Sequence, residues 1–161
     1  MHAQLLHKCK PIVDKPLSWT EIDQPVAGTG DVLIRVHACG ICRTDLHVVE
    51  GELDAGKYQL PVTPGHQVVG SIVTAPANSG LQPGQRVGVP WLHQTCGLCR
   101  FCRSGRENLC EQPQFTGWTR NGGFAEYLTA PSAFVYPLSD AMSDTAVAPL
   151  LCAGIIGYRC L

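Results

Sequence analysis

The chain has 161 residues, enough for one domain that buries about 70% of the surface exposed by the unfolded chain. Its net charge of -1, with 16% charged residues, excludes a strong electrostatic pull towards nucleic acid or an anionic membrane. No apolar run approaches the roughly 20 residues that span a bilayer, and no secretory leader is evident, so we expect a cytoplasmic protein without a membrane or nucleic-acid partner. Nine cysteines, an odd number, argue against a disulfide framework and for thiolates that hold metal.

The first part of the chain predicts strands joined by turns. Residues 1–23 have a weak strand pattern that carries no chemistry. Gly28 and Gly30 lie in a turn that precedes a strand, whereas the glycine loop of a dinucleotide site follows a strand and opens a helix. Alternating apolar residues then predict a half-buried strand over residues 32–39.

Residues 39–47 gather several chemically active side chains at the end of this strand. Cys42 is a soft metal ligand, and Asp45 is an acid that can orient another ligand. Thr44 has a hydroxyl that can pass a proton, and His47 is a titratable base. Together these groups describe a metal-centred site for proton and hydride transfer. The alternative is a polar helix start beside a buried thiol, because isolated Cys, Asp and His residues are mostly structural.

The next elements bring a histidine to the start of a strand. Residues 43–50 predict a short helix. An extended segment with two prolines, residues 59–64, leads to a β-branched run over 65–73, which predicts a buried strand with His66 at its start. After a turn, a further strand is expected over residues 86–92.

Four cysteines lie close together in the segment 93–112, which is too polar to form a core of its own. They are separated by two, two and seven residues: Cys96, Cys99, Cys102 and Cys110. This spacing lets one short lobe wrap a tetrahedral ion at Zn–S distances of about 2.3 Å. Zinc binding of order 10 kcal/mol would then order the lobe. An iron–sulfur cluster is possible on ligand type, yet four thiolates without apolar cover fit structural zinc better.

A nucleic-acid zinc ribbon is the functional rival of a structural lobe. Arg100, Arg103 and Arg106 give this rival some support. The balanced charge of the chain speaks against it, because such a ribbon requires salt-sensitive binding to DNA or RNA.

The C-terminal part predicts two short strands followed by helical structure. Residues 122–128 turn into a strand, and residues 133–138 form another. Residues 143–148 predict a capped helical turn, and the apolar run 149–158 predicts a helix. On residue type alone, Cys152 is a buried core thiol.

In this order, the motifs resemble the catalytic domain of zinc-dependent medium-chain alcohol dehydrogenases. The resemblance covers essentially the whole chain and rests on the combination, since any single motif would be weak. It is strongest to the branch that carries Gln after the zinc histidine. The matching segments are residues 39–45, 65–67, the four-cysteine lobe, 122–127 and 152–154.

The resemblance implies a mainly β (α+β) fold, a GroES-like partly open β-barrel with short helices and a zinc-binding lobe. It also implies two zinc ions per chain, one catalytic and one structural. The implied ligands are Cys42, His66 and Cys152 for the catalytic zinc, and Cys96, Cys99, Cys102 and Cys110 for the structural zinc.

The same resemblance assigns roles to residues near the catalytic zinc. Asp45 stands behind His66 as the acid that orients it. Thr44 is the hydroxyl on the alcohol, and His47 is the outer end of a proton relay. Arg43 faces the pyrophosphate of the cofactor.

Two further positions are of interest. Trp91 is expected either to line the substrate pocket or to be a core aromatic residue. Gln67 is placed among the catalytic residues, and it stands where the family usually carries Glu. We therefore expect a site that is less negative by one charge, with zinc acting as a stronger Lewis acid.

The family carries a Rossmann domain for the cofactor after the segment that contains Cys152. No strand followed by Gly-x-Gly-x-x-Gly and a helix occurs in this chain. We therefore expect residues 1–161 to be an incomplete GroES-like catalytic domain, in which residues 150–161 begin the connection to a missing cofactor domain. Such a chain would bind zinc but be inactive alone.

The resulting hypothesis is the catalytic-domain portion of an NAD(P)-dependent zinc alcohol dehydrogenase. The parent enzyme would oxidise an alcohol to an aldehyde or ketone by hydride transfer to NAD or NADP. Its implied partner is a small-molecule alcohol or aldehyde, and it is expected to be a homo-oligomer. The alternative is a non-catalytic zinc-binding module, or a degenerate remnant, that keeps only the structural zinc.

Overall fold

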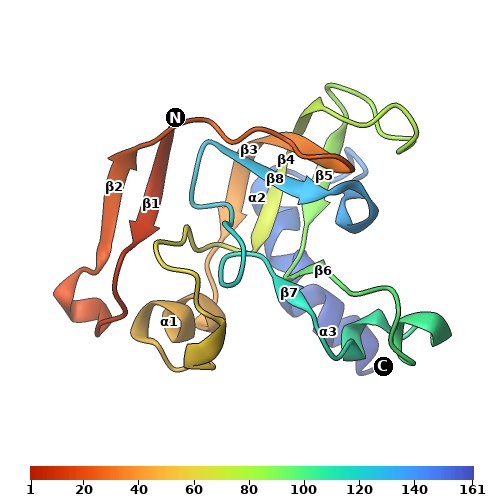
Figure 1. Cartoon of the computed structure of the whole chain (residues 1–161). Helices are drawn as coiled ribbons and strands as arrows, with labels where there is room; N and C mark the ends of the chain where they lie inside the picture. The colour runs from red at the N-terminus through yellow and green to blue at the C-terminus, as the bar shows by residue number, and fades with distance from the viewer.

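In the computed structural model, which describes residues 1–161, the chain is built mainly of antiparallel strands (Figure 1). The strands are β1 (His2–Leu6), β2 (Leu17–Glu21), β3 (Asp31–Gly40), β4 (Gln67–Thr74), β5 (Arg86–Val89), β6 (Leu92–Gln94), β7 (Gln114–Phe115), β8 (Tyr127–Pro131) and β9 (Tyr136–Pro137). Five of them form the central sheet in the order β8-β3-β4-β5-β9. The others form two-stranded sheets, β1 with β2 and β6 with β7. The mainly β fold with short helices expected from the sequence is confirmed.

Short helices connect these strands. The α-helices are α1 (Arg43–Glu50), α2 (Asp144–Val147) and α3 (Ala153–Arg159). The 3-10 turns are η1 (Ile12–Asp14), η2 (Ala55–Lys57), η3 (Cys102–Ser104), η4 (Glu107–Leu109), η5 (Ser132–Phe134) and η6 (Ala148–Leu151). No helix in the fold has the length and apolar composition that a membrane crossing requires.

Aliphatic side chains of the central sheet form the main core. Ile34 of β3 is fully buried and pairs with Ile72 of β4 on one side and Leu128 of β8 on the other. Val87 and Val89 of β5 complete this layer. Each such side chain contributes about 1.5–3 kcal/mol through burial, so the sheet forms the rigid base of the fold.

Two smaller apolar clusters dock the remaining segments. Val48 and Val49 of α1 pack with Leu6 of the N-terminal hairpin, and this contact fixes α1 beyond the end of β3. At the other end of the chain, Leu151 of η6 packs with Val69 of β4. In Figure 1, α1 lies at the lower left, below β1 and β3. The helix α2 lies behind the central strands, and α3 lies below them near the C-terminus.

The observed elements differ from the expected ones at several points. The helix expected over 149–158 is divided at Cys152 into the 3-10 turn η6 and the helix α3. The strand expected over 86–92 is divided into β5 and β6, with Pro90 between them; proline lacks the N–H that would continue the ladder. The strand expected over 133–138 is reduced to β9, because residues 132–134 form the 3-10 turn η5. The helix expected over 43–50 is confirmed, and Ser143 caps α2, as its hydroxyl accepts a hydrogen bond from the N–H of Ala146 at 3.3 Å.

Glycines allow backbone segments to cross next to His66. Gly117 has a φ of 78°, and a Cβ atom there would lie 2.8 Å from the nitrogen of Gly65. Gly123 donates to the carbonyl of Gly65 at 2.9 Å, which ties a third segment to the same point. Because a side chain at Gly117 would push these backbones apart, the crossing depends on glycine, and it fixes the position of His66.

We expect Gly117→Ala to destabilise the fold by about 2–5 kcal/mol, because it combines a left-handed conformation with an overlap against backbone atoms. Gly80→Ala is the matched control: Gly80 has a φ of 73°, but nothing lies within 4 Å of the added Cβ. That control should cost only about 1–2 kcal/mol. Urea unfolding measures both, and equal losses for the two variants would contradict the crossing as described.

Candidate metal and substrate site

Three side chains that are far apart in the sequence meet at one end of the central sheet. Cys42 precedes α1, His66 precedes β4, and Cys152 lies between η6 and α3. The Cys42 sulfur and the Nε2 atom of His66 are 3.2 Å apart. All three ligand atoms lie within 4.8 Å of one another. The structure therefore brings together the set that the resemblance implied, including Cys152, which looked like a core thiol from its own surroundings.

This group of donors fits a zinc ion. Catalytic zinc sites use three Cys, His or carboxylate ligands at about 2.0–2.3 Å, so neighbouring ligand atoms lie about 3.3–3.8 Å apart. Burial raises the pKa of the Cys152 thiol and the nearby Cys42 raises it further, while a hydrogen bond from Gln67 acts in the opposite direction. A bound cation would offset the repulsion between the two sulfurs.

Asp45 supports both neighbouring ligands. Its side chain is buried, with Oδ1 placed 3.0 Å from the Nδ1 atom of His66. Its Oδ2 atom accepts the backbone N–H of Cys42 at 2.8 Å. Because Nδ1 faces a carboxylate, we assign the hydrogen to Nδ1, which leaves the lone pair on Nε2 for a metal. A carboxylate placed in this way orients and strengthens a histidine ligand.

The start of α1 produces this geometry locally. Cys42 is the N-cap residue, and its sulfur accepts the backbone N–H of Thr44 at 3.3 Å. Asp45 bonds back to the N–H of Cys42, so the two residues form a reciprocal capping box. The same residues that begin the helix thus present a sulfur and a carboxylate to His66.

Gln67 lies next to this cluster on the first position of β4. It is 2% exposed and pairs with Gly40 of β3. The Gln67 side chain occupies the space that a Cβ atom at Gly40 would need. A neutral amide, rather than a carboxylate, is therefore buried beside the three ligands.

A mostly apolar cavity of about 450 Å³ opens beside the cluster, with His66 and Cys152 in its wall. The Trp91 ring stands edge-on to the His66 ring at 5.0 Å between centroids, and it also stacks on Phe115 and Trp118. Trp91 thus both lines the cavity and belongs to an aromatic cluster. The other wall residues are Thr44, Pro90, Leu92, Asn108, Tyr136, Leu151, Ile155 and Ile156.

The three remaining residues with expected roles all lie on α1. Thr44 faces the cavity. His47 lies one turn further on, and its Nδ1 atom contacts the carboxylate of Glu52. No hydrogen bond joins the side chains of Thr44 and His47 directly. Arg43 is exposed at the start of the helix and forms no ion pair.

The four lobe cysteines form a second group of possible metal ligands. The sulfur of Cys102 lies 3.5 Å from that of Cys99 and 3.9 Å from that of Cys96, and the sulfurs of Cys96 and Cys110 are 3.6 Å apart. A tetrahedral site with bonds of about 2.3 Å has sulfur–sulfur edges of about 3.8 Å. Disulfides, at about 2.05 Å, do not account for these separations.

Backbone N–H groups point at the lobe sulfurs. The N–H of Cys99 donates to Cys96 at 3.4 Å, and the N–H of Cys96 donates to Cys110 at 3.3 Å. Hydrogen bonds from the N–H groups of Cys102 and Glu111 lower the pKa of Cys99 to about 6. Burial raises the pKa of Cys102 to about 11. The lobe backbone is thus already arranged to hold negative charge on some of its sulfurs, as a cation site requires.

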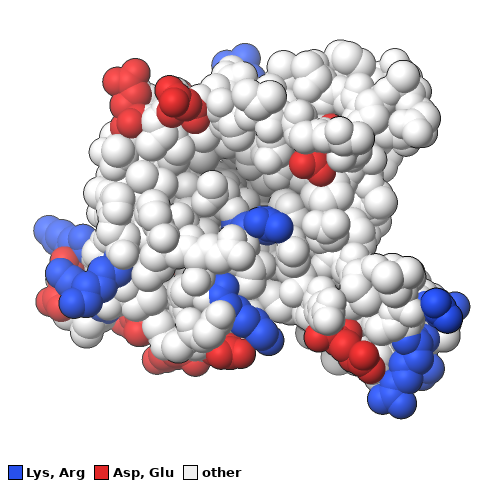
Figure 2. All heavy atoms as spheres, in the orientation of Figure 1, with Lys and Arg blue, Asp and Glu red and all other residues white.

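The outer surface of the lobe carries the arginines noted in the sequence. Figure 2 shows blue spheres gathered at the lower right, over the segment between β6 and β7, with acidic residues beside them. Arg100 lies 3.7 Å from Glu111, and both side chains are largely exposed. Elsewhere on this face, positive and negative residues are interspersed (Figure 2).

Residues 28–140 match the family described as the alcohol dehydrogenase GroES-like domain. The chain belongs to this family. The GroES-like domain is also similar to curated and solved alcohol dehydrogenases. An alcohol dehydrogenase of Geobacillus stearothermophilus is 43% identical over 148 residues, which are 91% of this chain and 44% of the relative. An NAD-dependent alcohol dehydrogenase of Sulfolobus acidocaldarius is 34% identical over 168 residues, covering 100% of this chain and 47% of the relative.

Among solved structures, the domain resembles a cobalt- and zinc-bound thermostable alcohol dehydrogenase from Pyrobaculum aerophilum. The TM-score is 0.84 at 29% sequence identity, and the match covers 99% of this chain and 48% of the other. The GroES-like domain thus spans about half the length of the relatives it matches.

Sequence reasoning missed part of the cavity wall. Asn108 and Tyr136 supply polar groups to a wall that is otherwise mostly apolar. Asn108 lies two residues before Cys110, so the position of the lobe brings it to the cavity. No local sequence signal marks Tyr136, because the edge strand β9 reaches the site only through its pairing with β5.

Proposed function

We propose that this chain is the catalytic domain of a zinc-dependent alcohol dehydrogenase. One zinc would be held by Cys42, His66 and Cys152, and a second by the four lobe cysteines. The observation that carries the proposal is the convergence of those three donors within 4.8 Å, beside a cavity large enough for a small alcohol. When bound, zinc would supply a Lewis acid that makes an alcohol hydroxyl more acidic.

The residues around the cavity have complementary roles in this proposal. Asp45 keeps His66 in the tautomer that offers Nε2, and Trp91 forms part of the wall of the substrate space. Gln67 lies beside the ligands without adding a negative charge, which favours a more electrophilic centre. The apolar wall formed by Leu92, Leu151, Ile155 and Ile156 offers a surface for the carbon part of the substrate.

A proton released by the alcohol needs an acceptor in this cavity. Thr44 lines the cavity, and its hydroxyl can accept that proton while passing its own towards His47. His47 lies on the same helix one turn away, and the contact of its Nδ1 with Glu52 leaves Nε2 as the accepting nitrogen. In the proposed proton path, Thr44 is the inner end and His47 is the outer end.

The hydride acceptor in this proposal is NAD or NADP, as the name of the Sulfolobus relative suggests for that protein. The exposed Arg43 beside the site offers a positive charge for the cofactor pyrophosphate. We propose that residues 1–161 form the catalytic part, that residues 93–112 form its structural zinc lobe, and that residues 150–161 begin the connection to a cofactor domain. A cytoplasmic, homo-oligomeric parent enzyme is part of the same proposal.

Metal content tests the proposal against a module that holds only a structural ion. The purified chain is expected to retain two zinc ions, and Cys152→Ser is expected to retain one. Cys160→Ser is the matched control, because Cys160 is exposed and outside both groups, and it should retain two. A wild-type chain with a single zinc, located in the lobe, would favour the non-catalytic alternative.

Activity gives a second test. The 161-residue chain is expected to show no alcohol-dependent formation of NADH or NADPH, since the proposed acceptor binds in a separate domain. Joined to a cofactor domain, it should turn over, and Cys42→Ser in that longer protein should not. Turnover by the chain alone would contradict the proposal that the hydride acceptor binds in a separate domain.

A further inference from the structure

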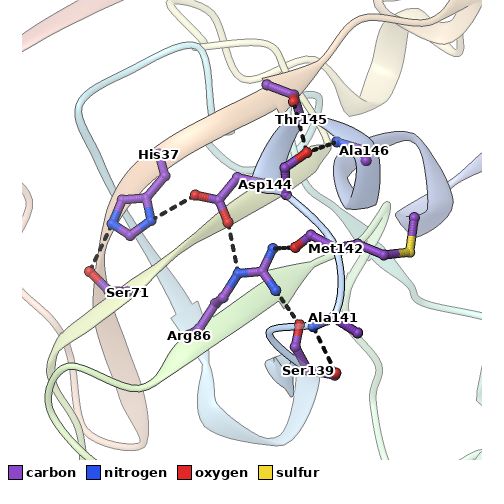
Figure 3. Close-up of polar contacts among 10 residues, drawn as sticks. His37, Ser71, Arg86, Ser139, Ala141, Met142, Asp144, Thr145 and Ala146 are labelled. Atoms are coloured by element: carbon purple, nitrogen blue, oxygen red, sulfur yellow. Dashed lines mark hydrogen bonds and ion pairs between the residues drawn. The ribbon is translucent and has the colours of Figure 1, made fainter.

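Arg86 binds the segment of chain that leads to Cys152. Arg86 is the first residue of β5, and its guanidinium faces the chain that leads into α2 (Figure 3). Its Nε donates to Oδ1 of Asp144 at 2.7 Å, and one terminal nitrogen donates to the carbonyl of Met142 at 3.0 Å. The other terminal nitrogen donates to the carbonyl of Ser139. One side chain thus fixes three points within residues 139–144.

The same carboxylate is bound from a second direction. Oδ2 of Asp144 lies 3.2 Å from Nδ1 of His37 on β3, and Nε2 of His37 lies 3.0 Å from the hydroxyl of Ser71 on β4 (Figure 3). We call Arg86, Asp144, His37 and Ser71 the Arg86 clamp. The Arg86 guanidinium also lowers the pKa of Asp144, so the carboxyl is charged at neutral pH. The clamp ties the start of α2 to three strands of the central sheet.

Residues 144–151 connect the clamp to Cys152 and are themselves packed against the sheet. From Asp144 the chain makes one turn of α2 and one of η6, and Leu151 then packs into the sheet. A Cβ atom at Gly88 of β5 would lie 2.8 Å from the end of the Leu151 side chain, so a side chain at position 88 would force Leu151 to shift. Arg86 and Gly88 are two residues apart on one strand, and together they hold both ends of the segment.

The three ligands are therefore secured in different ways. Cys42 and His66 are fixed by their own hydrogen bonds to Asp45. Cys152 follows η6 and does not belong to any strand, so its place depends on how its segment is docked. If the segment were loose, metal binding would have to supply the ordering free energy, and affinity would fall.

We propose that Arg86, acting with Asp144 and His37, is a positioning residue that preorganises Cys152 for metal binding. This inference rests on the proposed zinc site of Cys42, His66 and Cys152. The clamp makes no contact with the metal ligands themselves. Its effect is confined to the ligand that the 139–151 segment carries.

Thiol protection tests the inference at single-residue level. The full chain is titrated with zinc in a chelator buffer, pulsed with iodoacetamide and analysed by peptide mass spectrometry. We expect Arg86→Met to raise the free zinc concentration that half-protects Cys152 by about tenfold or more, as is typical when supporting contacts of a metal site are removed. His37→Ala, a milder change at a half-exposed side chain, should shift it in the same direction by less and guards against misfolding of the first variant.

The controls separate positioning from general stability. The lobe cysteines of the same molecules should keep their wild-type zinc dependence. Arg35→Met makes the same chemical change on β3 at an exposed arginine without an ion pair, and Leu128→Ala weakens the main core, a cluster separate from the one that contains Leu151. Neither should shift the protection of Cys152.

Each outcome decides a different question. Unchanged protection of Cys152 in both clamp variants, with wild-type protection present, would overturn the inference and leave the proposed function intact. An equal loss of protection in Arg86→Met and Leu128→Ala would also overturn it, because the effect would then be one of stability. Absence of zinc protection at Cys42 and Cys152 in the wild-type chain would overturn both proposals.

Discussion

Cys99→Ser is expected to cost the lobe its metal ion and its structure. Between residues 94 and 110 only Cys110 is buried, and Leu98 and Leu109 are exposed, so packing cannot hold this segment. Zinc binding to such thiolate sites is worth about 10–16 kcal/mol, which exceeds what a few hydrogen bonds contribute. We expect the zinc content to fall by one ion per chain and residues 95–111 to lose their protection from hydrogen exchange.

The central sheet serves as an internal reference for the exchange experiment. The central sheet should stay protected in Cys99→Ser, because its core of Ile34, Ile72, Leu128 and their neighbours lies outside the lobe. Wild-type chain treated with a strong chelator should reproduce the exchange pattern of the lobe. A lobe that kept full protection without metal would show that packing, and not the ion, orders it.

The second large effect is expected for Asp45→Ala. The side chain is 3% exposed and accepts hydrogen bonds from two groups, the Nδ1–H of His66 and the N–H of Cys42. Removing it leaves both donors buried without a partner, which costs about 1–3 kcal/mol for each. Loss of the carboxylate behind a histidine ligand also lowers metal affinity by about 10–100-fold.

Calorimetric unfolding and zinc competition measure these two consequences. Asp45→Asn keeps the shape and should retain part of the stability while still weakening metal binding, because a neutral amide polarises His66 less. Asp14→Ala is the matched control, since Asp14 is exposed and makes no ion pair, and it should change neither quantity beyond about 0.5 kcal/mol. If Asp45→Ala bound zinc as tightly as the wild type, the supporting role of this carboxylate would be wrong.

The lobe was the part of the site that the sequence predicted best from its own residues. Its four cysteines lie within fifteen positions, so their spacing alone limits what they can surround. The start of α1 was similarly accessible, because a capping box is local and Cys42 and Asp45 stand three residues apart. In both cases the relevant geometry is determined by short segments of chain.

The three-residue site could not be predicted in this way. Cys42, His66 and Cys152 are joined only by the folding of the central sheet, and Cys152 alone looked like a core thiol. The resemblance to a known family supplied the set. The Arg86 clamp had no such support, because no local pattern links His37 to Asp144, which it contacts across more than a hundred residues of sequence.

Local patterns failed where tertiary contacts or prolines intervened. Residues 133–138 form a short, mostly apolar run that is compatible with a strand, but their first part forms the turn η5 and only two residues pair with β5. Likewise, Pro90 interrupts the run over 86–92 and redirects it to β6 and the aromatic cluster of Trp91. These departures place both Trp91 and Tyr136 in the cavity wall.

Asn108 belongs to two neighbourhoods at once, the cysteine lobe and the wall of the cavity. An oxidant or chelator that opens the lobe would therefore also remove one face of the substrate space. In the proposed enzyme, damage to a region without any reacting atom would then register first as altered choice among alcohols, before the sheet itself unfolds.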